Sequence, residues 1–124
     1  PDYSSAASDV YKRQINYCVM AIIQGRYAYD LYADELSPEQ AADWYDQVRN
    51  EALKLMLSKN HDYGEAWRDM RISSLTDLIL AKVLRIKKIE DNDGLTKVSE
   101  GVEGNYFDML NYSVFALIHL SEEG

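Results

Sequence analysis

The chain has 124 residues and 47% of them are hydrophobic, which is enough for one modest globular domain with its own core. Its net charge of −8 argues against binding of duplex nucleic acid or an anionic membrane through the bulk surface, because such proteins carry a basic face. The single cysteine, Cys18, excludes an internal disulfide, and no apolar run approaches the roughly 20 residues of a membrane span. We therefore expect a cytoplasmic protein without a membrane-spanning segment.

The first 14 residues differ in character from the rest. Residues 1–14 resemble a translated sequencing-adapter read-through of the kind found in metagenomic assemblies, so we expect them to be non-native, although their composition permits a helix. From Ile15 the apolar residues follow helical spacing, with Val19 and Ile22 on the same face. This pattern predicts a helix from Ile15 through Tyr27.

The sequence from Ser37 is typical of a helix start. Ser37 suits the N-cap, Pro38 suits the first helical position, and Gln40 can complete a capping box. A stripe of apolar side chains follows, which predicts a long helix ending near residues 59–60.

Two further long helices are expected in the second half of the chain. Ser73 and Ser74 predict the start of the first, with Asp77 as its capping-box acid, and the turn at Asn92–Gly94 predicts its end. A glycine-containing loop then leads to a last helix over residues 103–120. No segment has the alternating pattern of a strand, so the chain is predicted to be all-α, a helical bundle of three long helices plus one separate N-terminal helix.

Two ten-residue segments match one another without a gap. Ile15–Gln24 aligns with Leu110–His119, and Asn, Tyr, Val, Ala and Ile are identical at matching positions. The economical interpretation is a tandem duplication. Residues 15–36 would then be the last helix of a truncated first repeat and its linker, and residues 37–122 the complete repeat domain. Apolar surface left by the missing half would favour a homo-oligomer.

The densest mixture of ionisable and aromatic residues lies between two of the expected helices, over residues 59–71. Gly64 divides this stretch, and Glu65–Met70 has the composition of a short helix. The stretch suits a polar site better than a core or a plain connector.

Four groups of residues resemble a known family: Lys59-x-x-Asp62-Tyr63-Gly64 with Trp67-Arg68, Ser74-Leu-Thr-Asp77, Lys82-x-x-Arg85-Ile86, and Glu100-Gly101 with Asn111-Tyr112. This set, over about residues 45–120, resembles the nucleotide modification associated domain, an all-helical family of uncharacterised function. More distantly, the layout is similar to that of the MazG-type all-α nucleoside triphosphate pyrophosphohydrolases, which hold magnesium over a triphosphate with acidic pairs on facing helices. Those pairs are not clearly matched here, since Glu100-x-x-Glu103 has the spacing but lies in the loop.

The candidate ligands of a magnesium ion are four acidic residues, Asp62, Asp77, Glu100 and Asp108. Magnesium prefers oxygen ligands and keeps several waters, so one or two carboxylates plus substrate phosphates suffice. Asp62, Asp77 and Asp108 would serve catalysis by holding this ion. Each has a structural alternative, because Asp62 can begin a turn, Asp77 can cap a helix, and Asp108 can belong to a solvated helix face.

Four basic residues are candidates for binding the substrate's phosphates: Lys59, Arg68, Lys82 and Arg85. Arginine offers a bidentate fork to phosphate, and Lys82 and Arg85 share a helix face. In so acidic a chain, salt bridges are the alternative use of these side chains.

Aromatic and amide side chains complete the predicted site. Tyr63 and Trp67 can stack on a base or pack in the core. Asn111 and Tyr112 can contact a ligand or form a network between helices, because a buried Asn needs hydrogen-bond partners.

Two hypotheses follow for the function. The first is a nucleotide-processing enzyme, a magnesium-dependent nucleoside triphosphate pyrophosphohydrolase acting on canonical or modified nucleotides. The alternative is a non-catalytic nucleotide-binding or assembly module, in which the same polar residues form a structural network. Convergence of the four acids on an open cleft would favour the enzyme, and their use in caps and salt bridges would favour the module.

Overall fold

The computed structural model describes residues 3–31, 36–92 and 101–123, and every regular element within these ranges is helical. The elements are α1 (Tyr3–Leu31), α2 (Pro38–Tyr63), the short 3-10 helix η1 (Ala66–Asp69), α3 (Ile72–Asp91) and α4 (Val102–Glu123). The expected all-α class is confirmed. None of the helices in the described ranges combines the length and apolarity needed to cross a bilayer.

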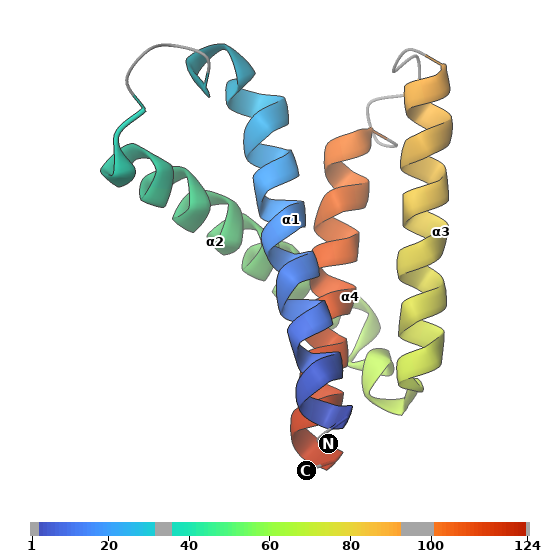
Figure 1. Ribbon diagram of the computed structural model, residues 1–124. Coiled ribbons are helices and arrows are strands. Elements are labelled where there is room, and N and C mark those ends of the chain that lie inside the picture. Colours follow the sequence, from blue (N-terminus) through green and yellow to red (C-terminus); the bar gives the residue numbers. More distant parts are fainter. Residues whose placement is uncertain (1–2, 32–35, 93–100, 124) are drawn as a thin grey trace.

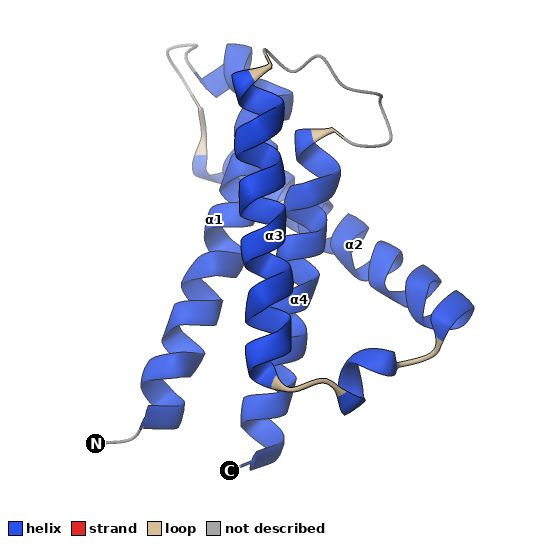
Figure 2. Cartoon of the chain, turned by 90° about the vertical axis from the view of Figure 1, so that its right-hand side faces the viewer, coloured by secondary structure: helices blue, strands red, loops and turns tan. Residues whose placement is uncertain are grey.

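Helix α4 is the central element of the bundle. It packs mainly against α1 and α3, and these three helices run nearly side by side while α2 crosses them obliquely (Figure 1). The short helix η1 joins the end of α2 to the start of α3 and contacts α4 (Figure 2). The stretch that the sequence marked as a polar site therefore lies against the central helix.

The buried apolar residues form two clusters. The larger one joins the four long helices and includes Cys18, Val19, Val48, Ile79 and Leu110. The smaller one anchors η1 and consists of Trp67, Leu75, Phe115 and Ala116. Burial raises the pKa of the Cys18 thiol to about 11, which agrees with a core position for this residue.

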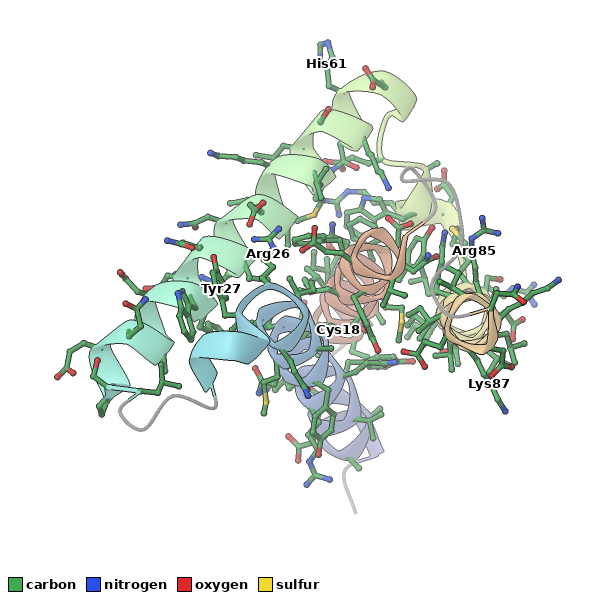
Figure 3. All side chains as sticks on the ribbon, turned by 90° about the horizontal axis from the view of Figure 1, so that it is seen from above. Cys18, Arg26, Tyr27, His61, Arg85 and Lys87 are labelled. Atoms are coloured by element: carbon green, nitrogen blue, oxygen red, sulfur yellow. The ribbon has the colours of Figure 1, made fainter. Side chains whose placement is uncertain are left out.

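Arg26 ties three helices together. Its guanidinium forms ion pairs with Glu51 of α2 and Glu103 of α4, and its Cζ lies 5.7 Å from the centroid of the Phe107 ring. Figure 3 shows Arg26 in the space between α1 and α2. The hydrogen bonds from Arg26 lower the pKa of Glu51, and this network fixes α2 across the bundle.

The start of α2 follows the sequence prediction. Ser37 is the N-cap, its Oγ accepts a hydrogen bond from the backbone N–H of Gln40 at 3.1 Å, and Pro38 occupies the first helical position. The end of α2 differs, because the helix continues beyond residues 59–60 to Tyr63 and stops at Gly64. Gly64 has φ 67° and ψ −168°, a conformation open to glycine, and this breaks the helix there.

The predicted start of the third long helix is wrong. Helix α3 begins at Ile72, with Arg71 as its N-cap and no side-chain cap hydrogen bond, so Ser73 and Ser74 already lie inside the helix. The carbonyl of Arg71 accepts from the backbone N–H of Ser74 at 3.0 Å, which closes the first turn. Asp77 therefore lies in the second turn and is not a capping acid. Met70 packs against the smaller cluster, which brings the chain straight from η1 into α3.

The loop expected before the last helix lies mostly in residues 93–100, outside the described ranges. The last helix, α4, begins at Val102 and ends at Glu123, so it is slightly longer at both ends than predicted.

Candidate functional site

A carboxylate held by two lysines from different helices lies at the centre of the candidate site. Asp108 of α4 accepts hydrogen bonds from Lys59 Nζ of α2 at 2.7 Å and is paired with Lys82 Nζ of α3 at 3.0 Å. The Asp108 and Lys82 side chains are only 21% and 27% exposed, whereas Lys59 is 56% exposed. The fold thus brings together three residues that the sequence predicted for the site.

A cavity of 500 Å³ with polar walls, here called the polar cavity, opens beside this carboxylate. Its lining residues come from α2, α3 and α4 and are Leu55, Lys59, Lys82, Arg85, Gly104, Asn105, Phe107 and Asp108. Three of these side chains are cationic and one is anionic, although the whole chain carries a net charge of −8. Lys59 and Lys82 alone carry one charge more than the Asp108 carboxylate that they share, and this suits an anionic ligand.

A smaller hollow of 260 Å³, here called the apolar cleft, adjoins the polar cavity and shares Lys59 and Asp108 with it. Its other lining residues are Met56, Asn60, Gly64, Ala66, Trp67, Met70, Leu78, Asn111, Tyr112 and Phe115. Most of these side chains are apolar or aromatic. A ligand with one charged and one largely apolar end therefore matches the two hollows together.

The indole of Trp67 is held firmly at the edge of the apolar cleft. It stacks on Phe115 with ring centroids 4.4 Å apart and planes 6° apart, and the Arg68 Cζ lies 4.5 Å from its centroid. His119 Nε2 forms a hydrogen bond with the Trp67 carbonyl at 2.8 Å. With the Phe115 ring and the Arg68 guanidinium packed against it and only 7% of the residue exposed, Trp67 offers little free ring surface on which a base could stack.

Two buried polar atoms beside the cleft lack hydrogen-bond partners. Asn111 donates from Nδ2 to the Ala52 carbonyl at 3.1 Å, but its Oδ1 has no partner. The Nε1 atom of Trp67 is likewise buried without one. The side chains are 6% and 7% exposed, respectively. Asn111 thus forms the link between helices that the sequence suggested and retains an unused acceptor.

The chain matches the family described as nucleotide modification associated domain 1 over residues 59–120, which is half of its length. This chain belongs to that family. Comparisons with curated proteins and with solved structures gave no match. Apart from Leu55 and Met56, every lining residue of the two hollows falls within the matched range. The candidate site is therefore built almost wholly from the nucleotide modification associated domain.

Arg68 and Tyr112, both predicted to bind the ligand, differ in whether they line a hollow. Arg68 is exposed, pairs with Glu65 and Glu122, and lines neither hollow; the hydrogen bond with Glu65 raises its pKa. Tyr112 is half-buried and lines the apolar cleft. The side chain of Tyr63 lies outside the described part of the structure.

The predicted magnesium ligands are not gathered in the described ranges. Asp62 is exposed near the end of α2, Asp77 is exposed on α3, and Asp108 is occupied by two lysines. Glu100 lies outside these ranges. Among the described residues, no three His, Cys, Asp or Glu side chains lie close enough together to hold a metal ion. The described residues therefore form no preformed metal site of three or more protein ligands.

Asn105 and Phe115 are among the lining residues that the sequence prediction did not include. Asn105 is 4% exposed, and its Nδ2 donates to the Gly101 carbonyl at 2.9 Å, which secures the start of α4 beside the polar cavity. Phe115 supports Trp67. Spacing does offer a signal for Phe115, because Asp108, Asn111 and Phe115 follow one helical face.

Proposed function

We propose that this protein binds the phosphate chain of a nucleotide in the polar cavity. The observation that carries the proposal is the carboxylate of Asp108 clamped between Lys59 and Lys82. Two lysines from separate helices carry one more positive charge than the single carboxylate that lies between them. A phosphate chain would supply the missing negative charge.

Asp108 acts in this proposal as an internal stand-in for the ligand. Its two oxygens each take one lysine, at 2.7 Å and 3.0 Å, and so hold both ammonium groups toward the cavity. An entering phosphate competes for the same two ammonium groups. Binding therefore exchanges one set of charge-assisted hydrogen bonds for another, which favours reversible recognition.

Three features favour a nucleotide over a simple anion. The family description concerns nucleotide modification, the apolar cleft shares two residues with the polar cavity, and the combined hollow has one charged and one apolar part. A nucleotide has the same division between its phosphate chain and its base.

A magnesium-dependent pyrophosphohydrolase is the second candidate function, and Asp108 is the observation that favours it. Among the predicted metal ligands that the structure describes, it is the one that lines the polar cavity, and a carboxylate beside phosphates is a common ligand of magnesium. Hydrolysis requires release of pyrophosphate from a nucleoside triphosphate, which is measured directly.

The test compares binding of tripolyphosphate and of the four canonical nucleoside triphosphates by calorimetry, with EDTA and with magnesium. Binding in EDTA at low salt is expected. The Lys82→Gln variant should weaken it about fivefold, since it removes one charged contact. The matched control is Lys87→Gln, which removes the same charge from the same helix. Arg85 lines the polar cavity together with Lys82, and Figure 3 shows Lys87 on the side of α3 opposite to Arg85.

Absence of binding to every one of these polyphosphates would overturn the proposal. Equal effects of Lys82→Gln and Lys87→Gln would show that only the overall charge matters. Pyrophosphate release that requires magnesium and disappears in Asp108→Asn would establish the hydrolase in its place.

A further inference from the structure

We propose that the apolar cleft is a nucleobase site that reads the edge of the base through Asn111 Oδ1 and Trp67 Nε1. This inference rests on the proposed function, because it assigns the second half of the same ligand. It differs from the stacking role that the sequence suggested for Trp67. Phe115 stacks on that indole, Arg68 lies over it and the residue is 7% exposed, so the role assigned to Trp67 is that of its N–H group.

The two unpartnered atoms are the starting point. A buried polar atom without a hydrogen bond is destabilising, and nearly all such atoms in folded proteins have a partner. Here two of them, Asn111 Oδ1 and Trp67 Nε1, belong to side chains that line the same cleft. Both atoms are covered in the free protein, so the proposed ligand reaches them by displacing the groups that cover them. Its two hydrogen bonds then offset the free-energy cost of leaving these atoms unpaired.

The hydrogen-bonding character of the two atoms is fixed. Because a backbone carbonyl can only accept, the bond to Ala52 identifies the donating nitrogen of Asn111 and leaves its oxygen as an acceptor. The indole nitrogen of Trp67 is a donor only. The ligand must therefore present one donor and one acceptor. The edges of nucleobases offer this combination, whereas a hydrocarbon chain offers neither.

The size of the cleft agrees with a single ring system. Pockets for drug-sized ligands span about 300–1,000 Å³. The cleft holds 260 Å³, so it suits a fragment such as one base. Met56, Met70 and Leu78 provide apolar walls for the faces of a planar ring. The shared residues Lys59 and Asp108 then mark where the base-bearing part of the ligand meets its phosphate chain.

Tryptophan fluorescence allows a direct test, because the chain has two tryptophans. Trp44 stacks on Tyr27, with ring centroids 4.3 Å apart, and lines neither hollow. In the full-length Trp44→Phe protein, Trp67 is the sole indole. At least one of the four nucleoside triphosphates should alter its emission. The same nucleotide should bind at least about fivefold more tightly than tripolyphosphate, because one added hydrogen bond contributes about that factor.

Two substitutions remove the two proposed contacts separately. Asn111→Leu keeps a similar volume without the acceptor, and Trp67→Phe keeps an aromatic ring without the donor. Each substitution should weaken the binding of the nucleotide about fivefold and leave the binding of tripolyphosphate unchanged. The control is Asn16→Leu, because Asn16 occupies the matching position on α1, where it accepts from Tyr45 at 2.6 Å.

The outcomes separate this inference from the proposed function. If tripolyphosphate binds and no nucleoside triphosphate binds more tightly, the base site is refuted while the phosphate site stands. If nothing binds, both fail. If Asn111→Leu weakens tripolyphosphate as much as nucleotide, Asn111 acts through the fold and the base contact is refuted. Trp67→Phe provides the same decision should Asn111→Leu not fold.

Discussion

Replacing Asp108 by Asn is the perturbation that best separates a binding module from a metal-dependent enzyme. The amide has the same shape but no charge, so it leaves Lys59 and Lys82 without their carboxylate. If Asp108 competes with phosphate, the variant should bind polyphosphate more tightly in the absence of metal. If Asp108 instead holds magnesium over the substrate, metal-dependent binding should weaken.

The expected gain in affinity follows from the charge that is removed. Two unit charges about 4 Å apart interact by about 1 kcal/mol in water and by about 4 kcal/mol at an effective dielectric constant of about 20. Asp108 is 21% exposed and its partner Lys59 is 56% exposed, which places the site between these limits. A repulsion of about 2 kcal/mol is then relieved, equivalent to about a thirtyfold gain in affinity.

The same substitution should reduce stability. Each of the two ion pairs contributes little where it is exposed, so their combined loss should lower the free energy of unfolding by about 1 kcal/mol. A bound polyphosphate restores neutralising charge to Lys59 and Lys82, and it should therefore stabilise the variant more than the wild type.

Calorimetric titration with tripolyphosphate in EDTA measures the affinity, and urea titration measures the stability. The matched control is Asp77→Asn, which removes the same charge from an exposed position on α3. A thirtyfold gain confined to Asp108→Asn supports the competition. Weaker binding in Asp108→Asn, or an equal gain in both variants, would refute the reasoning.

Three further predictions concern the fold. Ser37→Ala removes the N-cap acceptor and should lower the free energy of unfolding by about 1 kcal/mol in urea titrations, whereas Ser73→Ala, inside α3, should change it by less than about 0.5 kcal/mol; equal losses would contradict the helix starts. Gly64→Ala should cost about 1–3 kcal/mol in the same assay, because its φ of 67° and ψ of −168° strain any other residue, and an unchanged urea midpoint would disprove this. The folded-state pKa of Glu51 lies below its ordinary value of 4.5, so the ion pair with Arg26 stabilises the fold above that pH and its contribution disappears as the pH falls through the depressed pKa. On acidification from neutral pH to about pH 3, wild type should lose about 0.5–1 kcal/mol more than Arg26→Met, and parallel curves would show that the pair is energetically silent.

Local signals determined how much of the fold could be predicted. The cap at Ser37 was predicted correctly because serine, proline and glutamine together fit one placement of the helix start and do not fit a placement shifted by a residue. At Ser73 and Ser74 the pattern was as good, yet the N-cap of α3 is Arg71, which lies two residues before Ser73. The difference arises from packing, since Met70 lies against the cluster around Trp67 and sets the direction in which the chain leaves η1. Sequence spacing contains no information on that contact.

The site was predictable in its residue types and less so in its pairings. The spacing of Lys82 and Arg85 placed both on one face of a helix, and both line the polar cavity. The sequence did not show that Lys59 and Lys82 would share Asp108, because their helices meet only through tertiary packing. It left Trp67 with two roles, stacking on a base or packing in the core, and the structure shows the packing role, with Phe115 stacked on the indole.

The two matching segments show what their common pattern determines. Both form helices, and α1 and α4 pack closely together. Asn111 is 6% exposed and bonded to α2, and Tyr112 lines the apolar cleft, while Asn16 is exposed and Tyr17 is 67% exposed. The pattern therefore specifies a helix that can pack against its counterpart, and it does not by itself form a site. Of the two matching segments, the one in α4 contributes to the site, because η1 and α3 pack against α4. This difference makes Asn16→Leu a suitable control for Asn111→Leu.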